Sequence, residues 1–135
     1  MKIQLLSVLY LLIDMPPGTG DVALTVFQII PVDEIIIVTS PQDLVTLVVK
    51  KALKMAELMN INVLGVIENM SYVVCPDCQK HIQIFGQSKL EQFAKEANFK
   101  ILARLPIITE NTLLIDNGRA DDISLDEISS VIDLL

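Results

Sequence analysis

The stretch LLSVLYLLIDMPPGTGD, residues 5–21, is the strongest indication of the fold class. Leu5 to Ile13 is apolar on both faces, which is typical of a central strand in a parallel sheet. A loop from Asp14 to Gly20 follows, and a helix is predicted from about Asp21 to Pro31, because proline cannot continue a helix. Ligands bind at the carboxyl ends of strands in such sheets. Asp14 is therefore either a candidate ligand for Mg²⁺ through water or a solvated carboxylate at a strand end.

Strand and helix patterns alternate along the rest of the chain. Strands are predicted over residues 34–39, 62–67 and 100–105, and capped helices are predicted to begin at Ser40, Ser88 and Ser124. Pro41 takes the first helical position after Ser40, with Asp43 completing a variant capping box. This βαβ spacing predicts an α/β fold in which helices flank both faces of a parallel sheet.

The buried faces of two helices are predicted from apolar spacing. The helix after Ser40 is expected to pack Leu44, Val48, Met55 and Met59 on the sheet. Ser88 and Glu91 are expected to form a capping box at the start of the next helix. The packed face of this helix is expected to carry Leu90, Phe93, Ala94 and Ala97. Residues 72–85 break the alternation, because Val73–Cys75 and His81–Phe85 resemble two short strands around a tight loop.

Composition excludes several classes of protein. The 135 residues are 52% hydrophobic and 20% charged, which fits a single globular domain over residues 1–135. A net charge of −7 without a basic cluster disfavours nucleic acid as a partner. The apolar run from Ile3 to Ile13 is too short for a membrane span, which needs about 20 residues, and no small-residue cleavage site follows it. We therefore expect a cytoplasmic protein without a membrane partner.

The only two cysteines, Cys75 and Cys78, form a C-x-x-C pair. Two cysteines are too few for a secreted disulfide framework, so the pair indicates a metal or redox site in a reducing compartment. Zn²⁺ and [4Fe–4S] clusters normally take four ligands, and two chains would supply 2 + 2 thiolates. The Cys-Pro-Asp-Cys form also occurs in redox sites that open a helix, but the residues after Cys78 alternate as a strand does. His81 is more typical of an exposed strand residue than of a ligand.

An ordered series of segments resembles one protein family. Residues 11–21 resemble the Walker-B and switch-II segment of the Mrp/NBP35-type (ApbC-like) iron–sulfur cluster carriers, a branch of the deviant-Walker, MinD-like P-loop ATPases. The resemblance continues through residues 37–43, 65–72, 75–78, 84–86 and 105–107. It covers roughly residues 10 to 120 in the order and spacing of the family.

The resemblance implies a role for each matching residue. Asp14 is implied to aid Mg²⁺ binding and catalysis, and Gly18 to lie in the switch loop near the γ-phosphate. Asn69 is implied to read the adenine edge, with Pro106 closing over the base. Cys75 and Cys78 are implied to hold a [4Fe–4S] cluster that bridges a homodimer, and the cluster is implied to be delivered to apo iron–sulfur proteins. Each residue also has a structural reading: Gly18 in a tight turn, and Asn69 or Pro106 at a strand end.

The chain departs from the family pattern in one respect. No G-x-x-x-x-G-K-[ST] motif occurs in the printed sequence, no Gly-Lys dipeptide is present, and the lysine at the start of the family's deviant loop has no counterpart. The chain therefore resembles the C-terminal part of the family's domain, truncated at the N-terminus, and we expect it to bind ATP and Mg²⁺ poorly by itself. A second chain supplying the missing P-loop half is an expected partner. Whether this chain hydrolyses ATP stays open, as do a zinc-binding dimerisation module and an inactive fragment.

Overall fold

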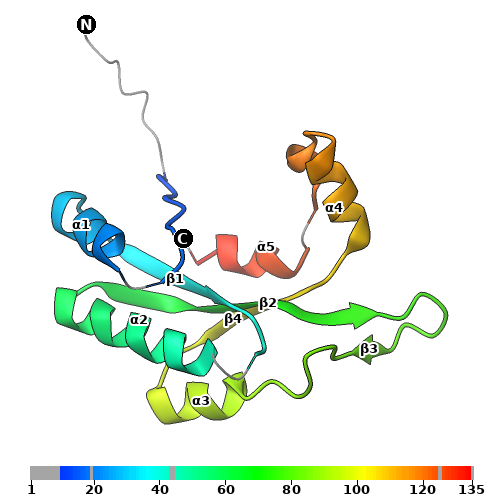
Figure 1. The fold of residues 1–135 in the computed structure, drawn as a ribbon, viewed down its shortest axis with the longest axis horizontal. Coiled ribbons are helices and arrows are strands. Elements are labelled where there is room, and N and C mark those ends of the chain that lie inside the picture. Colours follow the sequence, from blue (N-terminus) through cyan, green and yellow to red (C-terminus); the bar gives the residue numbers. More distant parts are fainter. Residues whose placement is uncertain (1–9, 19, 43–44, 125, 135) are drawn as a thin grey trace, which may run out of the picture.

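The computed structural model describes residues 10–18, 20–42, 45–124 and 126–134. Strands and helices alternate within them (Figure 1). The elements are α1 (Asp21–Ile29), β1 (Glu34–Thr39), α2 (Val45–Met59), β2 (Asn62–Val74), β3 (His81–Ile82), α3 (Leu90–Ala97), β4 (Ile101–Pro106), α4 (Thr109–Asp116), the 3₁₀ turn η1 (Ala120–Asp122) and α5 (Asp126–Ile132). Within this part of the chain, no helix is both long and apolar enough to cross a membrane.

The sheet has β2 at its centre, with β1 and β4 parallel to it on either side. The register pairs Thr39 of β1 and Arg104 of β4 with the same residue, Glu68 of β2. The short β3 pairs antiparallel with the far end of β2, through Val73↔Ile82 and Val74↔His81. The predicted parallel sheet is confirmed. The predicted hairpin is present, but its second strand spans only His81–Ile82 instead of His81–Phe85, and Cys75 lies just past the end of β2.

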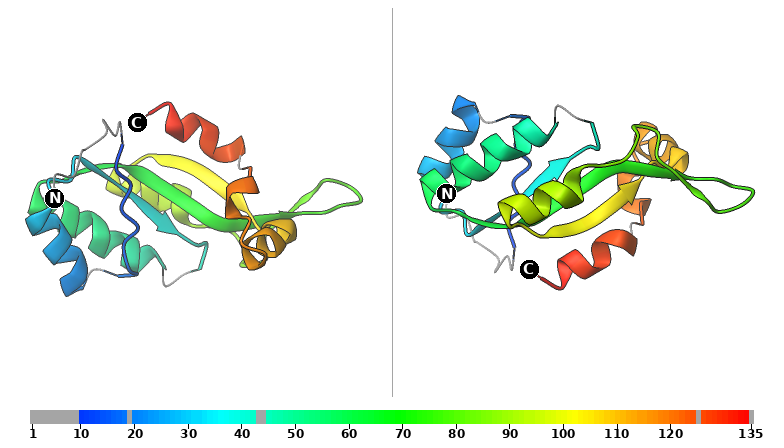
Figure 2. Two further views of the ribbon diagram at one scale, coloured as in Figure 1. Left: turned by 90° about the horizontal axis from the view of Figure 1, so that it is seen from above. Right: turned by 90° about the horizontal axis from the view of Figure 1, so that it is seen from below.

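Helices cover both faces of the sheet, and alternate residues of β2 face each side (Figures 1 and 2). Val66 packs with Val49 of α2 and with Leu90 and Phe93 of α3. Its neighbour Ile67 packs on the other face, in a cluster with Ala103, Leu105 and Val131. Because β1 and β4 are both parallel to β2, their carboxyl ends lie at one edge of the sheet, where β2 continues into the hairpin.

The strand predicted over Leu5 to Ile13 is not formed by the residues that the structure describes. Residues 10–13 have no strand assignment, and Leu11 and Leu12 are 76% and 78% exposed; residues 5–9 lie outside the described part. A strand requires a hydrogen-bonded neighbour, and no described strand pairs with this segment. An apolar run alone therefore did not identify a strand here.

The second helix also differs from its prediction. α2 is described from Val45, so Ser40 and Pro41 precede the helix instead of capping it, and Asp43 and Leu44 lie outside the described residues. Among the α2 side chains that the structure describes, Val49 and Ala56 are buried, whereas Val48 is 48% exposed. Apolar residues occupy more than one stripe of this helix, so periodicity could not select the face that meets the sheet.

The central strand is longer than predicted and contains an irregularity. Between the pairs Glu68↔Arg104 and Tyr72↔Pro106, β2 advances four residues while β4 advances two. Met70, inside this bulge, has φ 56°. Bulges re-aim side chains and are frequent beside functional sites. This one carries Asn69, the residue for which adenine recognition is predicted.

Candidate functional site

Two of the predicted nucleotide-binding residues lie on neighbouring strands at the same edge of the sheet. Asn69 follows Glu68 directly, at the level where β1 ends at Thr39. Pro106 ends β4 and pairs with Tyr72, just past the bulge. Because the carboxyl ends of parallel strands form the ligand-binding crevice of such sheets, this is the expected position for both residues.

The side chain of Asn69 is held by its own turn. Its Oδ1 accepts a hydrogen bond from the Met70 N–H at 2.8 Å, which suits the positive φ of Met70. The Nδ2 donors and the second lone pair of Oδ1 are not used by this bond. A carboxamide with a free donor and a free acceptor can pair with an adenine edge.

Asp14 and Gly18 lie in an exposed coil before α1. Within the described residues, Asp14 makes no hydrogen bond or ion pair, and none links it to Asn69. Gly18 has φ 96°, and a Cβ added there would meet no heavy atom within 4 Å. Glycine therefore suits this position because of its backbone conformation, not because of close packing. The structure brings Asn69 and Pro106 together at one edge and does not join Asp14 to them.

The cysteine pair lies in the turn of the β2–β3 hairpin, which projects from the body of the protein (Figure 2). The Cys75 N–H donates to the Lys80 carbonyl oxygen at 3.0 Å, and the Gln79 N–H donates to the Cys75 carbonyl oxygen at 2.9 Å. Gln79 has φ 57°, so the turn closes through a left-handed residue. Both thiols are free, and Cys78 is exposed. The turn therefore places an exposed Cys78 and a half-buried Cys75 together at the projecting end of the hairpin.

The turn also stabilises a thiolate. The backbone N–H of Cys78 lowers the pKa of the Cys75 thiol, with further lowering by the Asp77 N–H and the Cys78 thiol. Hydrogen bonds to the charged form favour that form, and the thiolate is the species that binds metals. No helix begins at Cys75 or Cys78, since Pro76 to Cys78 form a turn. The helix-opening arrangement that the redox alternative needs is therefore absent at this motif.

We predict that alkylation of Cys75 is half-maximal at a lower pH than that of an ordinary cysteine, whose pKa is about 8.5. A lowered pKa means that a larger fraction of Cys75 is thiolate at any pH below that value. Iodoacetamide labelling of each cysteine, followed by peptide mass spectrometry between pH 6 and 10, measures this midpoint. The same protein in urea is the control, because unfolding removes the N–H donors. A folded midpoint at or above the unfolded one contradicts the prediction.

The number of ligands limits what one chain can hold. Among the described residues, no group of three or more His, Cys, Asp or Glu side chains could hold a metal ion. The nearby His81 ring stacks on Tyr72, with centroids 4.1 Å apart and planes inclined by 11°. Its predicted place as an exposed strand residue is confirmed by β3. Four-coordinate binding at Cys75 and Cys78 therefore needs ligands beyond the residues that the structure describes.

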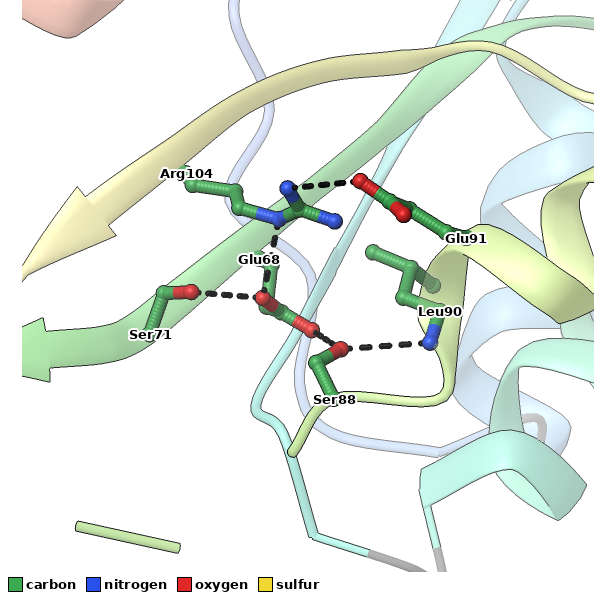
Figure 3. Close-up of polar contacts among 6 residues, drawn as sticks. All are labelled: Glu68, Ser71, Ser88, Leu90, Glu91 and Arg104. Carbon is green, nitrogen blue, oxygen red and sulfur yellow. Dashed lines mark hydrogen bonds and ion pairs between the residues drawn. The ribbon is translucent and has the colours of Figure 1, made fainter. Parts of the chain in front are cut away.

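Glu68, for which the sequence motifs predicted no role, has the largest fully buried side chain among the residues that the structure describes. Three side chains converge on its carboxylate (Figure 3). Ser71 Oγ donates to Oε2 at 2.6 Å, Ser88 Oγ donates to Oε1, and Arg104 Nε lies 3.3 Å from Oε2 in an ion pair. Ser88 Oγ in turn accepts the Leu90 N–H at 3.1 Å, whereas Glu91 pairs with Arg104 at 3.1 Å instead of closing the predicted capping box. Glu68 directly follows the strand predicted over residues 62–67, so the sequence offered no signal that it would be buried inside β2.

Comparison with known proteins identifies the relatives of this chain. A family model described as "ParA: NUBPL iron-transfer P-loop NTPase" matches residues 2–132. Proteins named iron–sulfur cluster carrier protein are 44% identical over 113 residues in Clostridium perfringens and 52% identical over 110 residues in Methanocaldococcus jannaschii. These alignments cover 84% and 81% of this chain but only 39% and 38% of the relatives.

A solved structure supports the same relationship. It is a nucleotide-binding protein from Archaeoglobus fulgidus in complex with ADP, with Co found by PIXE. The two structures superpose with a TM-score of 0.76 at 37% sequence identity, over 85% of this chain and 47% of the other. This agreement confirms the α/β P-loop nucleotide-binding fold class. The chain thus spans less than half the length of these two relatives and of this solved structure.

Proposed function

Since the chain belongs to the ParA-type family of NUBPL iron-transfer P-loop NTPases, we propose that it carries an iron–sulfur cluster on Cys75 and Cys78 and delivers it to apo-proteins. The observation that carries this proposal is the hairpin turn, which places two free thiols at a projecting tip and lowers the pKa of one of them. Structural metal sites such as those of zinc are closed, with all ligands supplied by the protein. A tip that is open to solvent suits cargo that must leave again.

The cluster is cargo that two chains share. Each chain contributes two thiolates, so a [4Fe–4S] cluster with four ligands bridges a homodimer related by a twofold axis. Transfer proceeds by ligand exchange: a thiolate of the recipient bonds to an iron as the Cys75 or Cys78 thiolate leaves it. The number of iron–sulfur bonds and the oxidation state of the cluster are unchanged. Apo iron–sulfur proteins are the recipients, in a reducing cytoplasm that keeps the thiols free.

Iron loading tests the proposal. The protein is purified and reconstituted without oxygen, and its iron, sulfide and oligomeric state are measured together. We expect about four irons per dimer and dissociation of the dimer when a chelator removes the cluster. One Zn²⁺ per dimer without iron uptake overturns the carrier function in favour of a zinc-binding dimerisation module.

Candidate contacts to a nucleotide are present in the printed sequence, but a Gly-Lys phosphate loop is not. We propose that Asn69 and Pro106 contact the base, that Asp14 assists Mg²⁺ binding and catalysis, and that Gly18 lies near the γ-phosphate. Support comes from the free donor and acceptor of Asn69 and from its place beside the end of β4. Bound Mg-ATP would supply hydrolysis that drives loading or release of the cluster. The phosphates have no matching Gly-Lys loop among these 135 residues, so a further polypeptide segment is needed to cradle them.

We predict that this 135-residue chain alone has no measurable ATPase activity and binds Mg-ATP only weakly. Backbone N–H groups and a lysine of the phosphate loop supply most of the attraction for a triphosphate. Calorimetric titration with Mg-ATP measures the affinity directly. A dissociation constant of about 1 μM or lower, near −8 kcal/mol, would show that the residues present suffice without such a loop.

A further inference from the structure

The cysteine hairpin belongs to a longer excursion of the chain from the sheet, residues 72–87. The residues that flank it contact the same buried carboxylate, that of Glu68. Ser71 precedes the excursion and Ser88 ends it, so residues 72–87, with both cysteines, lie between them. Both hydroxyls donate to Glu68, one to each carboxylate oxygen (Figure 3). Glu68 is 1% exposed. The base of the excursion is therefore closed by a single side chain of the central strand.

The two arms of the excursion differ in their other support. The outgoing arm continues β2, where Tyr72 pairs with Pro106, and the Tyr72 carbonyl oxygen accepts the Ile107 N–H at 2.7 Å. The returning arm forms a strand only at His81–Ile82. From residue 83 to residue 87, the backbone hydrogen bond of the described chain is internal, from the Gly86 N–H to the Gln83 carbonyl oxygen at 3.3 Å. Beyond the pairing of β3 with β2, Ser88 is thus the point where the returning arm is tied to the sheet again.

The carboxylate is suited to act as this anchor. A buried carboxylate is costly unless it is paired and hydrogen-bonded, and charge-assisted hydrogen bonds are about twice as strong as neutral ones. Glu68 has the Arg104 guanidinium on one oxygen, and Arg104 also pairs with Glu91 at the start of α3. Ser88 also accepts the Leu90 N–H, so the anchor links β2, β4, the returning arm and α3.

We propose that Glu68 is a positioning residue for the metal site: through Ser88 it fixes the returning arm of the hairpin and so sets where Cys75 and Cys78 are presented. This inference rests on the proposed binding of metal by the two cysteines. It assigns no contact between Glu68 and the cargo. A loose returning arm would let the tip move, and two tips must meet with matching geometry to complete four ligands.

Substitution of Ser88 tests the anchor by two measurements. Ser88→Ala removes the donor to Glu68, and we expect backbone amide exchange in the peptide over residues 80–88 to become about tenfold faster. Titration with Co²⁺ under anaerobic conditions, followed by its thiolate charge-transfer absorption, is expected to show at least about threefold weaker binding. Ser88→Thr keeps the hydroxyl and should restore both values.

Ser71→Ala is the matched control, because it removes a hydroxyl from the same carboxylate on the arm that β4 already holds. It should leave exchange over residues 80–88 and Co²⁺ affinity near the wild-type values. Equal effects of Ser71→Ala and Ser88→Ala, or unchanged exchange in Ser88→Ala, overturn the anchor. A wild-type protein that binds no Co²⁺ refutes the metal-positioning role together with the proposed function. In that case, faster amide exchange in Ser88→Ala would support only a structural contact between Ser88 and Glu68.

Discussion

Replacement of Cys75 or Cys78 by serine is expected to reduce iron uptake from about four irons per dimer to almost none. Each substitution removes one thiolate from each chain, so a symmetric dimer keeps two of the four ligands that the cluster needs. Serine is close in size to cysteine, but its hydroxyl is not deprotonated near neutral pH, so it does not supply the thiolate that binds the metal. Loss of the cluster should also abolish the cluster-dependent dimer.

The measurement is iron and sulfide content after anaerobic reconstitution, combined with the mass of the eluting species in size-exclusion chromatography. Asp77→Asn is the matched control, because it alters the same turn but keeps both thiols and the backbone N–H donor at position 77. It should load iron as the wild type does. Full loading in either serine variant, or a cluster on a monomer, would refute the bridging site.

The second large effect is expected for Gly65→Ala in the centre of the sheet. An added Cβ would lie 2.6 Å from Leu102 Cγ and 2.7 Å from the carbonyl oxygen of Lys100. The Leu102 side chain can move. The Lys100 carbonyl oxygen is held in place, because it accepts the Val66 N–H at 2.8 Å and so helps to join β2 to β4. Relief of the contact therefore separates the strands that carry Asn69 and Pro106. We expect a loss of about 3 kcal/mol in the free energy of unfolding.

Urea denaturation and thermal melting measure this loss, and a decrease in Tm of about 10 °C is expected. Gly20→Ala is the control, because its added Cβ meets no heavy atom within 4 Å and its φ of −83° suits alanine. It should cost less than about 1 kcal/mol, the usual penalty for losing a favourable residue at a helix start. A stability of Gly65→Ala within about 1 kcal/mol of the wild type contradicts the close packing of β2 against β4.

Features that depend on neighbouring residues followed from the sequence. The β-branched run of β1 and the alternation of strands and helices identified the parallel sheet. The hairpin was predictable because the alternating residues and the turn around Cys75 to Cys78 lie close together in the sequence. The family resemblance, confirmed by the match over residues 2–132, supplied the candidate positions Asn69 and Pro106. Their common place at the carboxyl edge then follows from the rules of parallel sheets.

Features that depend on distant residues did not follow. Glu68 contacts Ser88, 20 residues further along the chain, and Arg104, which follows α3 in the sequence. No local sequence pattern contained these contacts. The buried face of α2 did not follow from the sequence either, because Val49 instead of Val48 faces the sheet. The apolar run before Asp14 had the composition of a strand, but a strand is made by its hydrogen-bonded neighbour. Spacing and side-chain chemistry were therefore enough for most of the strands and helices and for the cysteine turn, whereas pairing, burial and the carboxylate contacts arose only where separate segments met.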